Sequence, residues 1–387
     1  MRCDTYTLED LASIKYGKNQ KKILSKNGSI PIYGTGGIMG YGKEALYNKP
    51  SVLIGRKGSI EKIRYVDHPF WTVDTLFYTE INTNLVIPHF LYYKIMLLDL
   101  KKYNEGTTVP SLRTETLNKL KFDIPKLEQQ KKILSVLEPI DKKIESLNKI
   151  NDNLEQQAQD IFKAWFVDFE PFGGVMPDDW KIVSLSEVAD FIGGYSYKGT
   201  ELGKSDIAMA TIKNFRRGGG FKLDGYKEII PSDKFKSVQY ADLFDILVAH
   251  TDLTQNAEVI GNAEIILNKS KYDNIIFSMD LVKVVPKEDK ISKFIIASIL
   301  KNENFKHHCL GYINGTTVLH LSKRALNDYK FALPNDLSIV KPLENILSLL
   351  YENLALNTEQ MMYLTSLRDT LLPKLMSGEI DASNIEI

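Results

Sequence analysis

Glu105-Gly-Thr-Thr-Val-Pro-Ser-Leu-Arg113 recurs in altered form as Asn314-Gly-Thr-Thr-Val-Leu-His-Leu-Ser322. The second copy begins 209 residues after the first (105 to 314), and a long run of heptad-like spacing follows each one. Upstream, Leu8-Glu-Asp-Leu-Ala resembles Leu185-Ser-Glu-Val-Ala at a separation of only 177 residues (8 to 185). A whole scaffold is therefore duplicated. The increase from 177 to 209 gives the second copy 32 additional residues, most of them between Tyr195 and Ser278.

The repeat divides the 387 residues into two halves, each long enough to bury a core. We predict a first globular domain at 1–126, a central long helix at 127–170, a second globular domain at 171–334 and a C-terminal long helix at 335–387. Short β-rich runs with one clear helix in each half favour a mixed α/β (α+β) fold. Because strands and helices do not alternate regularly, we expect an irregular mixed sheet with a helix beside it, not a doubly wound parallel sheet.

Local patterns place the elements of each half. The runs 51–55, 62–66 and 75–79 are rich in β-branched and aromatic residues and are bounded by Gly, Asp or Pro, which predicts strands. The segment 88–102 predicts a helix that begins at a proline, where the first turn tolerates one. Its counterpart in the second half is 291–304.

Each half ends in a one-sided apolar stripe. In 128–168 and in about 343–372, apolar residues recur at steps of four and three, which is typical of a coiled-coil seam. The predicted seam residues are Ile133, Leu137, Ile144, Leu147, Asn151, Leu154, Leu350, Leu354, Asn357 and Leu364. A polar residue on a seam typically gives up stability for a defined register, which is the role we expect for the two asparagines. Pro139 predicts a kink or a restart near Glu138.

Two one-sided helices in one chain can bury their stripes against each other. Since each helix follows an equivalent domain, we expect them to run antiparallel in a pseudo-twofold coiled-coil spacer. A helix of about 40 residues is ~60 Å long at ~1.5 Å per residue. The long helices therefore predict a device that holds two domains a fixed distance apart.

Charge is segregated along the chain although the formal net charge is zero. Residues 1–125 carry 18 Lys and Arg against 12 Asp and Glu, and residues 171–333 carry 21 against 20. The helical segments are acidic, with 7 against 9 in 126–170 and 3 against 8 in 334–387. This distribution fits globular parts that meet phosphates and helices that do not. Long exposed helices also collect glutamate for solubility alone.

Several classes of protein find little support. The charged N-terminus and the lack of an apolar run of ~18 residues favour a cytoplasmic protein without membrane contact. Two distant cysteines support neither a disulfide framework nor a zinc site, and no metal site is predicted. Gly37-Ile-Met-Gly-Tyr-Gly-Lys-Glu44 nearly matches a phosphate loop, but Glu44 replaces the metal-binding hydroxyl and no long helix is expected after it. We interpret 33–42 as a flexible loop whose backbone approaches a ligand, and we predict no catalytic residue.

Polar and basic runs in the globular halves instead fit the reading of DNA grooves. Arg and Lys suit guanine edges and phosphates, and Asn and Gln suit adenine. The candidate DNA contacts are Tyr33, Thr35, Arg56, Lys57, Ser59, Thr107, Thr108, Arg113, Lys213, Asn214, Arg216, Arg217, His250, Thr251, Thr254, Gln255, Asn256, Thr316, Thr317 and Lys323. Arg56 and His250 follow the same kind of apolar strand in the two halves, which supports equivalent roles.

Over essentially its whole length the chain resembles the specificity subunits of type I DNA restriction-modification systems. The resemblance rests on Val52-Leu-Ile-Gly-Arg-Lys-Gly-Ser59, Phe70-Trp-Thr-Val-Asp74, the Gly106-Thr-Thr-Val copy, Leu127-Glu-Gln-Gln-Lys-Lys-Ile-Leu-Ser-Val-Leu-Glu-Pro-Ile-Asp-Lys-Lys-Ile-Glu145, Met176-Pro-Asp-Asp-Trp-Lys181 and Asp245-Ile-Leu-Val-Ala-His-Thr-Asp-Leu-Thr-Gln255. It implies two target-recognition domains that each read one half of a bipartite asymmetric site in double-stranded DNA, with the helices as a ruler between them.

The resemblance also implies partners. Two methyltransferase subunits and the ATP-dependent restriction subunits would dock on this chain, and those partners would bind S-adenosylmethionine, ATP and Mg²⁺. This chain itself would bind no cofactor and would not be an enzyme. The alternative from another class is a non-catalytic two-domain scaffold that binds protein or glycan through its tyrosines.

Overall fold

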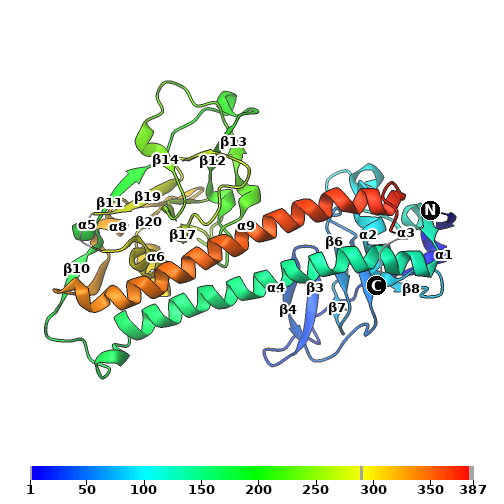
Figure 1. The fold of residues 1–387 in the computed structure, drawn as a ribbon, viewed down its shortest axis with the longest axis horizontal. Helices are drawn as coiled ribbons and strands as arrows, with labels where there is room; N and C mark the ends of the chain where they lie inside the picture. The colour runs from blue at the N-terminus through cyan, green and yellow to red at the C-terminus, as the bar shows by residue number, and fades with distance from the viewer. Residues whose placement is uncertain (1, 288–290, 383–387) are drawn as a thin grey trace. The chain divides into compact units, whose positions relative to one another are not determined.

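The computed structural model describes residues 2–287 and 291–382, so the parts of the predicted segments at Met1, 288–290 and 383–387 lie outside the described residues. The chain forms two compact units (Figure 1). The first comprises Met1–Lys143 and Leu364–Ile387, and the second comprises Ile144–Tyr363. Two long helices, α4 (Leu127–Phe166) and α9 (Lys341–Ser377), contribute residues to both units.

The first unit combines three small sheets with short helices. Its strands are β1 (Cys3–Thr7), β2 (Ala12–Tyr16), β3 (Ile30–Gly34), β4 (Gly37–Gly42), β5 (Ser51–Gly55), β6 (Ile63–Val66), β7 (Trp71–Thr72), β8 (Leu76–Ile81) and β9 (Lys121–Pro125). Its short helices are α1 (Leu8–Leu11), α2 (Pro88–Met96), the 3-10 helix η1 (Leu100–Tyr103) and α3 (Thr114–Asn118). The sheets have the orders β1-β9, β2-β8-β5-β6 and β4-β3-β7. Only the β3–β7 pairing is parallel among these strands.

The second unit has the same plan with additions. Its strands are β10 (Trp180–Ser184), β11 (Ala189–Gly193), β12 (Ile207–Ala210), β13 (Lys227–Glu228), β14 (Tyr240–Ala241), β15 (Ile246–Ala249), β16 (Thr251–Asp252), β17 (Ala263–Ile265), β18 (Asn274–Phe277), β19 (Leu281–Pro286), β20 (Ile313–Asn314), β21 (Leu319–Leu321) and β22 (Lys330–Pro334). Its shorter helices are η2 (Glu170–Phe172), α5 (Leu185–Val188), η3 (Gly199–Glu201), η4 (Ile212–Asn214), η5 (Leu223–Gly225), η6 (Ser237–Gln239), α6 (Lys293–Lys301), α7 (Glu303–Leu310), α8 (Arg324–Asp328) and η7 (Leu337–Val340).

Sheet topology confirms the internal repeat. The pair β10-β22 corresponds to β1-β9, β11-β19-β15-β17 corresponds to β2-β8-β5-β6, and the parallel pairing of β12 with β18 corresponds to that of β3 with β7. The short helices α1 and α5 begin with equivalent capping boxes, Thr7 with Asp10 and Ser184 with Glu187. The additional residues of the second copy form β14 and η3 to η6, which lie between 194 and 278 as the repeat predicts.

In each unit the long helices pack on the globular core as well as on each other. Ile133 and Leu137 of α4 and Leu372 of α9 share the first core with Phe90 of α2 and Val52 of β5. Because α4 is amphipathic, one face can join this core while the other stays in solvent. The helices run antiparallel, since Arg368 Nη1 lies 3.0 Å from Asp141 Oδ1 in the first unit and Asn357 bonds to Asn151 in the second.

The second core is built in the same way. Ala158, Phe162 and Phe166 of α4 lie against Leu343 and Leu347 of α9 in a cluster that also contains the strands of the unit. The predicted seam residues Leu147 and Leu354 are buried, while Ile144, Leu154, Leu350 and Leu364 are half-buried. Tyr351, which the heptad pattern missed, is also buried. The division of the chain at 126, 170 and 334 stays a prediction.

Three local expectations are wrong, and a fourth is narrowed. Residues 33–42 are not a flexible loop but form the β3–β4 hairpin. As expected, no helix follows β4 at 43–50, where a phosphate loop would require one. Of the kink or restart predicted near Glu138, the restart is excluded, since α4 is continuous through Pro139, and the kink stays a prediction. The helix expected at 291–304 is two helices, because Asn302 ends α6 and its side chain caps α7 by accepting from the amide of Asn304. In the first half, α2 likewise ends before the predicted 102.

Candidate nucleic-acid interface

Three predicted contact segments meet in the first unit. The amide of Gly58 donates to the carbonyl of Pro110 at 2.9 Å, and Leu112 N donates to Arg56 O at 2.9 Å. These bonds hold the 56–59 loop against the Gly-Thr-Thr-Val turn. A Cβ placed on Gly58 would lie 4.0 Å from Thr35 Oγ1, so the turn between β3 and β4 adjoins the same loop. The structure therefore brings Thr35, the loop and the turn together.

Arg56 is held in place by its neighbours. Its guanidinium lies 5.1 Å from the centre of the Tyr16 ring, and Nη1 donates to Asp74 O at 3.0 Å. Stacking on an aromatic face and a backbone acceptor restrict the side chain, so less rotamer freedom is lost when it meets a ligand. Sequence reasoning missed Tyr16, because the strand pairing of β2 with β8 brings it to this loop.

Equivalent segments converge in the second unit. Gln255 Nε2 donates to Thr316 O at 2.6 Å, which joins the loop after β16 to the second Gly-Thr-Thr-Val turn. Asn262 Nδ2 donates to Arg216 O at 3.2 Å, and Arg217 Nε lies 3.1 Å from Glu258 Oε2. The Arg216–Arg217 loop therefore belongs to the same cluster.

Arg56 and His250 occupy equivalent backbone positions. Arg56 N donates to Thr75 O at 2.9 Å, and His250 N donates to Asp280 O at 2.7 Å. The carbonyl of Arg56 accepts from Leu112 N, and that of His250 accepts from Leu321 N at the same distance of 2.9 Å. The scaffold thus presents one position twice with different side chains.

Two buried carboxylates that were not predicted support the second cluster. Asp252 accepts from the amides of Thr254 at 2.8 Å and Val259 at 2.6 Å, so it holds the 251–260 loop. Burial alone would raise the pKa of Asp252, but these hydrogen bonds keep it below the ordinary value. Glu264 accepts from the amide of Gly220 in the glycine-rich loop and from Lys301 Nζ at 2.7 Å. An acidic residue in a strand carries no sequence signal for such a role.

The predicted contacts differ in exposure. Tyr33, Asn214 and Thr251 are buried and bonded within the fold: Tyr33 packs on Phe70 and lies near His68, Asn214 donates to Lys222 O, and Thr251 donates to Asp280. The exposed candidates are Lys57, Thr107, Thr108, Arg113, Lys213, Arg216, Arg217, Gln255, Asn256, Thr316, Thr317 and Lys323, and the half-buried ones are Thr35, Arg56, Ser59, His250 and Thr254.

The electrostatic environment of His250 differs from that of Arg56. Burial, with the nearby charges of His320 and Lys323, lowers the pKa of His250 below its ordinary 6.5. His250 is therefore mostly neutral at neutral pH, whereas Arg56 is always charged. The two units consequently present different charges at equivalent positions.

Among the described residues, no group of three or more His, Cys, Asp and Glu side chains is arranged to hold a metal ion. Within the same residues, no helix is both long and apolar enough to span a bilayer. Cys309 is buried, which raises the pKa of its thiol to about 12.

Comparison with known families gives this architecture a name. Residues 2–156 and 177–361 match the family described as "Type I restriction modification DNA specificity domain", once in each half of the repeat. The chain belongs to the type I restriction-modification specificity subunits. Its division into two matches agrees with the duplicated scaffold.

Relatives support this membership of the specificity subunits. The chain is 24% identical over 362 residues to the type I restriction enzyme MjaIX specificity subunit of Methanocaldococcus jannaschii, covering 87% of this chain and 78% of the relative. It is 25% identical over 367 residues to the HindI specificity subunit of Haemophilus influenzae, with coverages of 78% and 79%. The fold is similar to the crystal structure of an S subunit from M. genitalium, with a TM-score of 0.58, 18% identity and coverages of 97% and 96%.

Proposed function

We propose that this specificity subunit reads a bipartite, asymmetric site in double-stranded DNA, one half with each globular unit. The recurrence of one loop cluster on an equivalent scaffold in both units carries the proposal. Arginine at one copy of the shared position and histidine at the other favour different base sequences in the two halves. In this proposal the target-recognition domains span 1–126 and 171–334.

The long helices α4 and α9, in the predicted spacer segments 127–170 and 335–387, would set the spacing between the half-sites. Support comes from the continuity of α4 through Pro139 and from the matched asparagines on the facing helices. Half-sites read from one side of DNA lie about 34 Å or a multiple of that apart, and a helical pair is stiff enough to fix such a distance.

Chemistry on DNA would belong to partners. We propose that two methyltransferase subunits dock on this chain and recruit restriction subunits, and that those proteins bind S-adenosylmethionine, ATP and Mg²⁺. The chain would be non-catalytic and would act in the cytoplasm. Apolar side chains exposed on α9, among them Leu349 and Leu356, support a role of the helices in docking.

Exchange of recognition domains tests the proposal. The chain is co-expressed with methyltransferase subunits, and the methylated sequence is determined for the native protein and for a chimera in which residues 171–334 come from another specificity subunit. We expect one half of the methylated site to change and the other to persist. A single contiguous site, or one in which both halves change, would contradict the proposal.

Salt dependence distinguishes DNA reading from the alternative scaffold function. Binding dominated by phosphate contacts weakens steeply as salt concentration rises. Association with protein or glycan through exposed tyrosines depends less on charge. A shallow salt dependence of partner binding, with no DNA binding at low salt, would favour the scaffold.

A further inference from the structure

The β3–β4 hairpin, drawn in blue in Figure 1, exposes apolar side chains beside the candidate interface. Exposed fractions are 52% for Ile38, 60% for Met39 and 48% for Tyr41. β4 is an end strand of the sheet β4-β3-β7. Residues 23–25 bond along the outer edge of β4, yet these three side chains stay exposed. Exposed apolar side chains invite association, so a binding partner is the expected reason for them.

A β-bulge leaves one of these residues unpaired within the hairpin. The pairing passes from Ile32 with Gly40 to Tyr33 with Ile38, so Met39 has no partner across the hairpin. Bulges typically redirect a side chain and increase the local twist. Met39 lies across Gly34, where a Cβ would come within 2.3 Å of its Sδ atom. Glycine at 34 therefore makes room for this arrangement.

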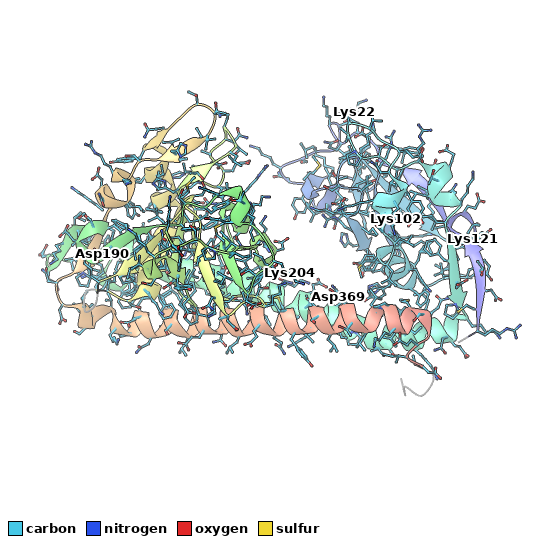
Figure 2. All side chains as sticks on the ribbon, turned by 90° about the horizontal axis from the view of Figure 1, so that it is seen from above. Lys22, Lys102, Lys121, Asp190, Lys204 and Asp369 are labelled. Atoms are coloured by element: carbon cyan, nitrogen blue, oxygen red, sulfur yellow. The ribbon has the colours of Figure 1, made fainter. Side chains whose placement is uncertain are left out.

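The surroundings of the hairpin are basic. Residues 18–44 contain the lysines Lys18, Lys21, Lys22, Lys26 and Lys43, and Glu44 is their one acidic residue. The part of this segment at 23–25 lies along β4, since Ser25 N donates to Tyr41 O at 3.0 Å and Lys43 N donates to Ile23 O at 3.1 Å. Figure 2 shows Lys22 on the side of the first unit that is turned away from the long helices.

The hairpin tip adjoins the candidate contacts. A Cβ at Gly37 would lie 3.5 Å from Arg64 Nη2, and the neighbouring Thr35 lies near Gly58 of the Arg56 loop. An apolar tip with a basic rim fits a polyanion that also has apolar surface. Double-stranded DNA has both, in its phosphates and in its bases.

We propose that Ile38 and Met39 form an apolar wedge that inserts at a base step of the DNA half-site read by the first unit, with the surrounding lysines on the flanking phosphates. This inference rests on the proposed function. Ile and Met are among the residues that proteins insert between bases, partly unstacking them and bending the duplex.

The second unit gives the wedge an internal comparison. The strand that corresponds to β4 in the sheet order is β13, which consists of Lys227 and Glu228. Charged residues are costly to insert into a base stack. The wedge is therefore expected to distort only the half-site of the first unit.

The test uses the full chain with its methyltransferase subunits and duplexes that carry 2-aminopurine at each position of the target in turn. We compare wild type, the double variant Ile38→Ala/Met39→Ala, and Leu97→Ala, which removes an exposed leucine at the end of α2 in the same unit. Because all three residues are exposed, the variants should fold, and thermal unfolding checks this. We expect wild type and Leu97→Ala to raise 2-aminopurine fluorescence at one step of the first half-site.

The double variant should lose that fluorescence signal and bind the site about tenfold more weakly, with the second half-site unaffected. Specific binding by the wild type without a signal in the first half-site, or with a signal that the double variant keeps, would overturn the wedge and leave the proposed function intact. If the double variant instead loses association with methyltransferase subunits, the hairpin is a protein contact. Failure of the wild type to bind DNA specifically would end both proposals.

Discussion

Asn357 Nδ2 donates a hydrogen bond of 2.8 Å to Asn151 Oδ1 across the two long helices. Asn151 in turn points its amide nitrogen at Thr358 Oγ1, 3.4 Å away. The heptad pattern predicts each asparagine as a polar residue that interrupts the apolar seam of its own helix. The structure places the two asparagines opposite each other. A matched polar pair in an apolar seam penalises every other alignment of the helices, because any slip leaves a half-buried amide unpaired.

Replacing both asparagines by apolar residues should raise the stability of the protein but loosen the register of the two helices. Asn151→Leu alone leaves the Asn357 amide without its partner and should lower the free energy of unfolding by about 1–3 kcal/mol. The double variant Asn151→Leu/Asn357→Leu should be more stable than either single variant and more stable than wild type, but should permit alternative helix pairings. Urea unfolding measures the first effect, and the number of methyl NMR signals from the helices measures the second.

The control is Asn353→Leu, which changes an exposed asparagine on the same helix and should leave both properties unchanged. A double variant with a single set of signals and unaltered DNA specificity would show that the pair does not set the register.

Loss of the Glu264 carboxylate should destabilise the second unit. Glu264 has a side-chain exposure of 4% and lies 2.7 Å from Lys301, which Glu155 also approaches to 3.7 Å. Burial alone would lower the pKa of Lys301, but the two carboxylates outweigh it and keep the pKa above its ordinary value. Glu264→Gln should therefore cost about 3 kcal/mol in the free energy of unfolding, since it leaves a buried ammonium less well paired.

The double variant Glu264→Gln/Lys301→Met removes both charges and should recover much of that loss in urea unfolding. Equal stability of the Glu264→Gln protein and the wild type would show that Glu155 alone suffices for Lys301.

The sequence predicts the frame of this fold better than its contacts. Apolar period, capping residues and the repeat are local signals, so the duplication, the strand at 51–55 and the long helices are confirmed. The β3–β4 hairpin escapes prediction because its glycines are typical of loops, and only the pairing of β4 with β3 shows that they form strands. The partners of Arg56 and Gly220 come from distant segments, which no local pattern reveals. Base contacts stay predictions.

Stability should depend on pH through His250. Because its pKa in the folded protein lies below the ordinary 6.5, the folded state binds fewer protons than the unfolded state as the pH falls through that range. The free energy of unfolding should therefore decrease as pH falls below about 7 and level off once folded His250 is itself protonated. His250→Gln should remove this decrease in urea unfolding between pH 8 and pH 5.

His320→Gln removes one of the nearby groups that lower the pKa of His250, so it should shrink the decrease without abolishing it. An unchanged pH profile in His250→Gln would assign the effect to another group.

Neighbouring basic residues should affect DNA binding differently. Lys57 is exposed, so Lys57→Ala should weaken binding to all sequences and reduce the slope of log affinity against log salt by about one. Arg56→Lys keeps the charge but loses the planar group stacked on Tyr16, and should cost about 1–3 kcal/mol of discrimination at one base of the first half-site. Binding titrations at several salt concentrations measure both effects.

Lys121→Ala, which removes an exposed lysine of β9, should change neither quantity. A uniform loss with Arg56→Lys, without altered base preference, would make Arg56 a phosphate contact.

Each glycine of the repeated turn should be required for binding the half-site of its own unit only. Gly315 has a φ of 105°, and a Cβ there would lie 2.2 Å from Val318 O. A Cβ at Gly106 would lie 1.9 Å from Val109 O. Each glycine→alanine change must therefore displace its turn, which should lower the free energy of unfolding by about 1–3 kcal/mol. It should also weaken binding to the half-site read by the same unit. Methylation of targets in which one half-site is altered at a time measures this second effect. Gly193→Ala, in β11, meets no atom within 4 Å and should do neither. Normal binding by Gly315→Ala would exclude the turn from the interface.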